Sequence, residues 1–553
     1  MAIFYGKGSV MTVRLAVIFG YFMVLLSIGF LTRTRWKATP DEYFLAGRRL
    51  AGFLLLGTMA ATNFSAFTVF GASGAGYRHG YAFFPIVGFG TGFMALTFWL
   101  IGKKARELGK ANALITPAEL VGNLYSNRSL SLVFSIVMII FTIPYIALQP
   151  IAGGYVLNRL FDLPQAAGAC LVTLIIVIYT FRGGLRAVAW TDMFQGSLMV
   201  VLLIVAFFLV SSHHGGLGKA NETLRLANPA LLSRPGGVGA FGPAMWFSYL
   251  MLWFFCDPMF PQLFQRFFSA RSEKALARTM LFYPFVCTLV FLLPVSLGVM
   301  GTLTFPGLSG KEADQILPIL LTEICGDFMG TLIMSAGLAA LMSTMDSQLL
   351  TLSSIFTRDI YPAVTGQKVK SAMPGKIFVL VLAGLGVLMA INPPGTILKI
   401  ATQTFTGLAV LFPTVLMGLY TRRPDPVAAI TSIISGEALV LLSYVGKFPS
   451  GGFLPAVPII VLAFAVYFVV SFTRGKGGVG ILLPSRRTML FSLLFLSLFV
   501  LAIDWWWWND SASYLWGFPF WVIYFIILSA IQTLLMRWWL KSGRPHPFDP
   551  PVS

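Results

Sequence analysis

The chain has 553 residues, of which 57% are hydrophobic and only 11% are charged, and its formal net charge is +19. Soluble globular proteins carry roughly a quarter charged residues, so this composition excludes a soluble domain and indicates a polytopic membrane protein. The positive charges gather in alternate short loops between apolar runs, as orientation signals do, which argues against a nucleic-acid partner. The four cysteines, Cys170, Cys256, Cys287 and Cys325, lack the spacing of a disulfide framework or a zinc site.

Fifteen apolar runs are candidates for spans, each of which needs about 20 residues. If the N-terminus is outside, the cytoplasmic segments hold 29 Lys and Arg residues and the outer segments 10, together the 39 of the chain. This bias predicts a plasma-membrane protein with an outer N-terminus and a cytoplasmic C-terminus, and it places Arg266 and Arg271 in a cytoplasmic loop. The predicted spans lie near 12–32, 51–77, 81–102, 130–157, 164–181, 190–212, 241–262, 279–303, 329–357, 376–392, 400–420, 426–445, 455–473, 488–508 and 518–537.

Two of these spans are interrupted in mid-membrane. The second span carries a polar, small-residue stretch from Gly57 to Phe67, and the seventh carries Asp257–Pro258 followed by Pro261. Helices broken at matching places in two halves are the best sequence indication of a transporter's binding site. Spans 2–6 and 7–11 number five each and have opposite topology, which fits such halves. Alternatively, the glycines serve helix packing and the prolines only kink their helix.

The ninth span carries a polar stripe at membrane depth, where each unpaired polar group costs several kcal/mol. Hydroxyl groups and the carbonyls freed by a helix break bind a cation without the desolvation cost of a full charge. We therefore expect a cation site formed by this stripe and the break around Ala61–Phe64. The stripe consists of Ala340, Ser343, Thr344 and Ser347, at i, i+3, i+4 and i+7 of one helical face, with Asp346 at its edge.

Three segments resemble motifs of the sodium/solute symporter family. They are Tyr43–Arg49 before the second span, Tyr179–Gly196 around the fifth and sixth spans, and Leu341–Tyr361 in the ninth. The resemblance covers roughly residues 12–475 and is closest to the proline and pantothenate transporters. It implies an all-α, LeuT-type fold with a five-plus-five inverted repeat and additional N- and C-terminal helices, about fifteen spans in all.

The same resemblance implies two cation sites. Ala61, Phe64 and Ala340, through their carbonyls, and Ser343 and Thr344 match the sodium site common to the family. Some members, such as sialic acid transporters, have a second sodium site, and its positions match Asp192, Ser343, Asp346 and Ser347. Because two close carboxylates push one pKa up, Asp192 and Asp346 are expected to share either a sodium ion or a proton. The alternative for Asp192 is an ion pair with Arg182 or Arg186.

The candidate substrate site follows from the same comparison. Trp253, Pro261 and Tyr145 match residues of the proline transporters, whereas Asp257 replaces a tyrosine and Phe67 replaces a tryptophan. An intramembrane aspartate is a functional candidate, so Asp257 is expected either to face an amino group of the solute or to cap the broken helix. Asn63 in the first break and Gln403 in the eleventh span complete the candidate substrate residues. Thr402, next to Gln403, is a further candidate. Glu437 and Asp504 are expected to pair with neighbouring helices.

These features predict a secondary transporter that couples inward sodium flow to uptake of a small polar organic solute, such as an amino acid, a carboxylate or a vitamin-like compound. Proton coupling and a transporter-like nutrient sensor are the alternatives, and no protease-type or metalloenzyme motif indicates an enzyme. The expected layout is an N-terminal segment with the first span (1–50), the first repeat (51–212), an outer loop (213–240), the second repeat (241–420) and a peripheral C-terminal unit (421–553).

Overall fold

The computed structural model describes residues 7–32, 39–237, 239–367, 373–475, 486–508 and 514–542. Residues 33–38, the first part of the predicted loop between the first two spans, lie outside the described residues. Within them, twelve helical stretches are long and apolar enough to cross a membrane. A helix overlaps each of the fifteen predicted spans. The second and third spans both overlap the single stretch Phe67–Ala111, and the spans outside the twelve stretches are the fifth, Gln165–Phe181, and the seventh, which is broken.

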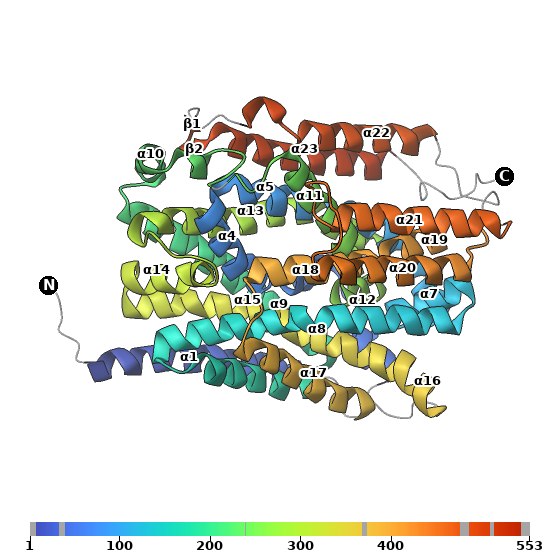
Figure 1. Cartoon of the computed structure of the whole chain (residues 1–553). Helices are drawn as coiled ribbons and strands as arrows, with labels where there is room; N and C mark the ends of the chain where they lie inside the picture. The colour runs from blue at the N-terminus through green and yellow to red at the C-terminus, as the bar shows by residue number, and fades with distance from the viewer. Residues whose placement is uncertain are drawn as a thin grey trace.

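The helices run side by side along one direction, so that the bundle has two ends (Figure 1). The first half of the chain forms α1 (Lys7–Leu31), α2 (Pro40–Leu45), α3 (Gly52–Asn63), α4 (Ala72–His79), α5 (Phe83–Phe93), α6 (Lys103–Ala111), α7 (Pro117–Tyr125), α8 (Arg128–Phe161), α9 (Gln165–His213) and α10 (Leu217–Ala227). The second half forms α11 (Pro243–Cys256), α12 (Pro261–Ser269), α13 (Glu273–Thr304), α14 (Ile316–Ile324), α15 (Gly326–Ile355), α16 (Tyr361–Thr365), α17 (Met373–Ile391), α18 (Ile397–Ala409), α19 (Phe412–Tyr420), α20 (Pro426–Tyr444), α21 (Ala456–Thr473), α22 (Arg486–Leu501), the hairpin β1 (Tyr514–Leu515) and β2 (Phe518–Pro519), and α23 (Phe520–Lys541).

Both predicted interruptions are present. Helix α3 ends at Asn63 because Phe64 leaves the helical region (φ −84°, ψ 87°), and a π-helical turn, Phe67–Gly71, leads into α4. Helix α11 ends at Cys256, and a 3-10 turn, Asp257–Met259, separates it from α12. Proline lacks an amide hydrogen and is tolerated in the first turn of a helix, so Pro261 ends the irregular stretch by starting α12.

A third break divides the 49-residue helix α9 into the predicted fifth and sixth spans. Gly184 has φ 63° and ψ 178°, a conformation that is essentially restricted to glycine. The helical hydrogen bonding continues on both sides, so the chain changes direction without forming a loop. The Gly183–Gly184 pair of the sequence motif therefore has a conformational role here.

Close contact between α4 and α13 depends on small residues. A Cβ atom added to Gly298 would lie 1.9 Å from the carbonyl oxygen of Ser73, and one added to Gly76 would lie 2.5 Å from the carbonyl oxygen of Val295. The two backbones thus touch directly, as is common between membrane helices. This contact joins the broken helix of the first repeat to the second helix of the other repeat.

The C-terminal unit differs from the prediction for its two acidic residues. Asp504 forms a fully buried ion pair with Arg234, which belongs to the loop before α11 and not to a neighbouring helix. Glu437 on α20 has two buried carboxylate oxygens without a hydrogen-bond partner in the described part of the chain, so its expected pairing is not observed. Helices α22 and α23 pack together, and α23 also contacts α5 and α13.

Candidate functional site

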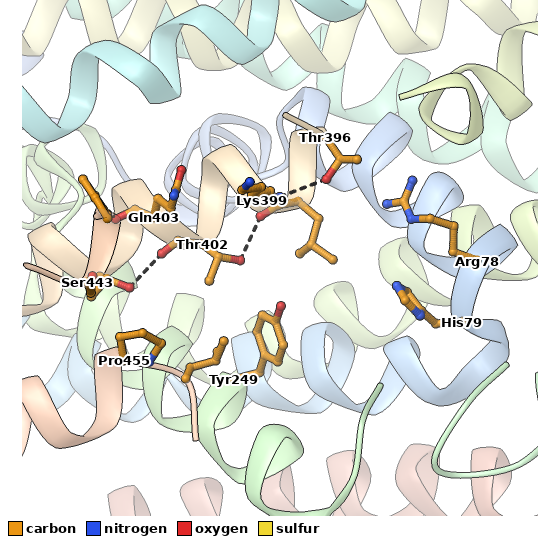
Figure 2. A pocket seen from close by; sticks show the side chains of 13 residues that line it. Arg78, His79, Tyr249, Thr396, Lys399, Thr402, Gln403, Ser443 and Pro455 are labelled. Atoms are coloured by element: carbon orange, nitrogen blue, oxygen red, sulfur yellow. Dashed lines mark hydrogen bonds between the residues drawn. The ribbon is translucent and has the colours of Figure 1, made fainter. Parts of the chain in front are cut away.

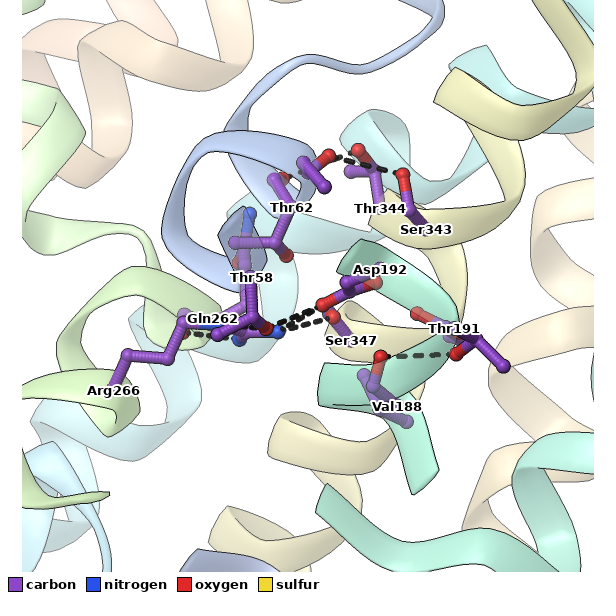
Figure 3. A network of polar contacts seen from close by, with 12 residues as sticks. Thr58, Thr62, Val188, Thr191, Asp192, Gln262, Arg266, Ser343, Thr344 and Ser347 are labelled. Carbon is purple, nitrogen blue, oxygen red and sulfur yellow. Dashed lines mark hydrogen bonds and ion pairs between the residues drawn. The ribbon is translucent and has the colours of Figure 1, made fainter. Parts of the chain in front are cut away.

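The broken end of α3 contacts the polar stripe of α15. The Ser343 hydroxyl lies 3.0 Å from the carbonyl oxygen of Ala61 and 3.1 Å from that of Ala340. The Thr344 hydroxyl lies 3.1 Å from the carbonyl oxygen of Thr62 and 3.3 Å from that of Ala340. Each hydroxyl has one hydrogen, so it donates to one carbonyl at a time and keeps lone pairs for another ligand. Five oxygen atoms from two helices therefore gather at this contact, which Figure 3 shows at the Thr62, Ser343 and Thr344 side chains.

The carbonyls are available because α3 stops there. The last four carbonyls of a helix have no amide partner in a following turn, so they turn to other donors. Ala61, Ala340, Ser343 and Thr344 were predicted to share a site, and the structure brings these four together. Phe64 lies just beyond them, buried, with its ring stacked on that of Tyr283 at 6.3 Å. The Thr62 carbonyl was not predicted, although its place in the same final turn was visible in the sequence.

A buried ion pair lies one to two turns along the same contact. Arg266 donates from Nη2 to Asp192 Oδ2 and to Ser347 Oγ, both at 2.8 Å, and from Nε to Thr58 Oγ1 at 2.9 Å. Thr58 in turn donates to Asp192 Oδ2 at 2.5 Å. Both charged side chains have no exposed surface. The guanidinium therefore links α12, α3, α9 and α15 at one point (Figure 3).

This ion pair corrects two sequence-based interpretations. Arg266 was assigned to a cytoplasmic loop, but it lies on α12 and is fully buried. Asp192 was given Arg182 or Arg186 as alternative partners. Its observed partner is Arg266, Arg186 is exposed, and the side chain of Arg182 lies outside the described part of the structure. A charge close to a predicted helix end looks like an orientation signal, and only the fold shows that α12 turns it inward.

Asp346 lies next to this ion pair but has a different partner. Its Oδ2 accepts a hydrogen bond of 3.0 Å from the hydroxyl of Tyr179, which also lies 3.3 Å from the carbonyl oxygen of Met342. Nearby, the amide nitrogen of Gln195 donates to the hydroxyl of Tyr21 at 2.9 Å. The four elements that meet here are α1, both parts of α9, and α15.

Several acceptor oxygens in this region have no hydrogen-bond donor among the described residues, and three of them lie on α9 and α15 around the two carboxylates. These three are Asp192 Oδ1, Asp346 Oδ1 and Gln195 Oε1, and all three side chains are fully buried. With both carboxylates ionised, the single guanidinium of Arg266 leaves one negative charge uncompensated. Buried acceptors and buried charge normally have partners, so this region is suited to a further cation or a proton.

The predicted substrate residues fall into two groups. Phe67, Trp253 and Tyr145 gather around the ring of Phe405, whose centroid lies 6.1, 5.3 and 4.9 Å from theirs. Phe260 packs against the same ring at 4.8 Å. The indole nitrogen of Trp253 is buried and has no hydrogen-bond partner in the described chain. Phe405 and Phe260 were missed because the chain has 50 phenylalanines, and none of them differs from its neighbours in sequence.

The second group lies at the breaks themselves. The amide nitrogen of Asn63 donates to the hydroxyl of Tyr283 at 2.7 Å. Asp257 is buried and accepts a contact of 3.5 Å from the thiol of Cys256. Its side chain does not cap α12, whose N-terminus has no side-chain cap, so that alternative is not observed. Pro261 is the first residue of α12 and is buried.

A cavity of about 340 Å³ opens at the end of the bundle where α4 stops and α18 begins. Gln403 and Thr402 are part of its wall, together with Arg78 and His79 of α4 and Tyr249 of α11 (Figure 2). The ring of Tyr249 lies 6.1 Å from that of Trp253, so the aromatic cluster forms a layer next to the cavity.

The comparisons with known proteins agree with this geometry. The model of the sodium:solute symporter family matches residues 43–436. The chain belongs to the sodium:solute symporter family. Similar relatives include a sodium/pantothenate symporter of Haemophilus influenzae, 28% identical over 411 residues, which are 73% of this chain and 84% of the relative. A sodium/proline symporter of Staphylococcus aureus is 26% identical over 477 residues, 83% of this chain and 92% of the relative.

Solved structures show the fold of this symporter. A sodium-coupled sialic acid symporter in a substrate-bound, outward-open state superposes with a TM-score of 0.68 and 21% identity, covering 84% of this chain and 98% of that one. A nucleobase-cation-symport-1 family transporter gives a TM-score of 0.50 and 14% identity, covering 93% and 98%. The symporter therefore has the expected LeuT-type fold, with sodium as the coupling ion.

Proposed function

We propose that sodium binds between α3 and α15, to the carbonyls of Ala61, Thr62 and Ala340 and the hydroxyls of Ser343 and Thr344, with the Phe64 carbonyl at the rim. The observation that carries this proposal is that each of the two hydroxyls lies within 3.3 Å of the Ala340 carbonyl and of a carbonyl at the broken end of α3. A cation held there stabilises one arrangement of the two helices, and this differential affinity couples ion and solute.

The solute is taken up into the cell through the cavity beside Gln403 and reaches the aromatic cluster of Phe67, Tyr145 and Trp253. Asn63, Asp257 and Pro261 line the two breaks and complete the proposed substrate site. We assign the solute to small polar organic compounds, and no enzymatic reaction is part of this function. The proposal is supported by Tyr249, which lines the cavity and packs against Trp253 of the aromatic cluster.

The N-terminus lies outside the plasma membrane and the C-terminus inside in this proposal. The positive-inside rule supports this orientation, because the predicted cytoplasmic segments hold the greater share of Lys and Arg. The cavity then faces outward, since α4 ends and α18 begins on the outer side. Inward movement of one positive charge gains about 2.3 kcal/mol per 100 mV of membrane potential, which is enough to drive accumulation.

A second cation site is formed by Asp192, Asp346 and Ser347. The three buried acceptor oxygens without donors favour it, and either sodium or a proton would compensate the remaining charge. If a proton is the second coupling ion, Asp346→Asn abolishes the effect of a pH gradient on uptake and keeps the sodium requirement.

Uptake by the full-length protein in proteoliposomes tests the function. The solute panel contains pantothenate, proline, sialic acid and the neutral alcohol panthenol, each supplied with a sodium gradient, a pH gradient or neither. We expect at least one solute to accumulate only with the sodium gradient. Accumulation driven by the pH gradient in the complete absence of sodium contradicts sodium coupling.

A further inference from the structure

The cavity at the ends of α4 and α18 presents positive charge without any negative charge. Arg78 and Lys399 are its two charged lining residues, and no Asp or Glu belongs to the described wall. A concave site lined by one sign of charge concentrates ligands of the opposite sign. The remaining polar lining groups are hydroxyls, an amide and an imidazole.

Arg78 is fixed in place by a counter-ion that the cavity does not reach. Its Nη1 donates to Asp314 Oδ1 at 2.9 Å and to the carbonyl oxygen of Gly310 at 3.0 Å. The Asp314 side chain is only 1% exposed, and its Oδ2 accepts the amide hydrogen of Ile397, the first residue of α18, at 2.8 Å. Burial raises the pKa of Asp314, while Arg78 opposes that shift. The acid is thus hidden behind the guanidinium, which faces the cavity in Figure 2.

One face of α18 forms the opposite wall. Lys399, Thr402, Gln403 and Thr406 recur at i, i+3, i+4 and i+7, and all of them line the cavity. Figure 2 shows Thr402 and Gln403 on one side of the space, Arg78 and His79 on the other, and Tyr249 between them. Lys399 is exposed and lines the cavity at the start of this face.

We propose that the entrance cavity of this symporter admits organic anions in preference to cations, and that Lys399 is a specificity-determining residue. This inference rests on the proposed function of the cavity as the entrance for the solute. A cationic solute meets two positive side chains, and the ammonium of a zwitterionic amino acid finds no carboxylate in the cavity wall. Asp257 does not provide one, because it is buried and does not line the cavity. Specificity then comes from repulsion of cationic solutes as well as attraction of anionic ones.

The local charge preference is measured without knowing the solute. A cysteine introduced by Thr402→Cys in the full-length protein is labelled with an anionic and a cationic methanethiosulfonate reagent of similar size. Each rate is divided by the rate of the same reagent with a free small thiol, and labelling of the protein without the new cysteine is subtracted. We expect the anionic reagent to be favoured about tenfold, and Lys399→Gln to remove most of this preference.

Lys447→Gln is the matched control, because Lys447 is exposed in the loop after α20 and does not line the cavity. It should leave the ratio of the two rates unchanged. A ratio that favours the cationic reagent, or equal effects of Lys399→Gln and Lys447→Gln, overturns the proposal. In the uptake panel, pantothenate should then be preferred over panthenol and proline. Sodium-driven uptake of panthenol or proline alone overturns the anion assignment but leaves the proposed symport intact.

Discussion

Arg266 is a charged residue buried among four helices of this symporter. Its guanidinium has no exposed surface, and it bonds Asp192, Ser347 and Thr58 on three other helices. Breaking a buried ion pair by removing one partner leaves an uncompensated charge in a medium that solvates it poorly. Substitutions that remove the charge of either Arg266 or Asp192 are therefore expected to destabilise the helix bundle.

Replacing Arg266 by glutamine should lower the free energy of unfolding by about 3–5 kcal/mol. The double variant Arg266→Gln/Asp192→Asn should recover part of this loss, because it removes the stranded carboxylate. Thermal unfolding of the detergent-solubilised protein measures both changes, with Arg186→Gln on an exposed side chain as the control. Equal losses in the single and double variants would show that the pair does not act as a unit.

The sequence predicts single residues well where polarity contrasts with the surroundings. Ser343 and Thr344 stand out as hydroxyls in an apolar helix, and the structure places them against the predicted break. Arg266 does not stand out, because arginines are common at the cytoplasmic ends of spans. Phe405 is hidden in the same way among many apolar residues. The polar half of the candidate site is thus readable from sequence, and the aromatic half depends on the fold.

At the scale of elements, the breaks decide where carbonyls become available. The breaks after α3 and α11 were visible in the sequence as polar or proline-containing interruptions. The division of α9 was expected as two spans, but not as one helix that bends at Gly184. The hairpin of β1 and β2 was not expected either, since two-residue strands leave no periodic pattern to detect.

Gly184→Ala should cost about 1–3 kcal/mol of stability, because an L-residue at φ 63° and ψ 178° is strained. Gly384→Ala on α17 is the matched control. That glycine is exposed within a helix, and an added Cβ meets nothing within 4 Å, so the change should be neutral or stabilising by up to about 1 kcal/mol. The stabilities of the two variants are compared by their melting temperatures in the same detergent. A Gly184→Ala protein as stable as the Gly384→Ala protein contradicts the strained break.

At the scale of the whole molecule, a buried ion pair joins the last two helices to the core, in addition to the packing of α23 on α5 and α13. Arg234 bonds Asp504 twice, at 2.8 Å each, and lies within 5.5 Å of the ring centroids of Trp246, Trp508, Trp521 and Phe525. The loop that carries Arg234 also touches the end of α4, through a hydrogen bond of 3.1 Å from the amide of Gly237 to the carbonyl of His79. Helices α22 and α23 therefore hold this loop over the wall of the cavity.

Asp504→Asn should destabilise the protein by about 3–5 kcal/mol, since it leaves Arg234 charged and buried. Asp327→Asn breaks the half-exposed pair with Arg14 and should cost less than about 1 kcal/mol. Limited proteolysis of the loop at 228–241, together with thermal unfolding, detects the difference. Similar behaviour of the two variants would mean that the C-terminal helices are held by apolar packing alone.

The central claim, that sodium bridges α3 and α15, is tested most directly by equilibrium binding of radioactive sodium to the purified protein without solute. Ser343→Ala and Thr344→Ala each remove one proposed oxygen ligand and should raise the sodium concentration for half-occupancy about tenfold, the loss expected for one bond to a charged partner. Ser335→Ala is the matched control, because Ser335 is a buried serine of the same helix that bonds only the carbonyl of Leu332. Half-occupancy at the same sodium concentration in all three variants contradicts the bridge.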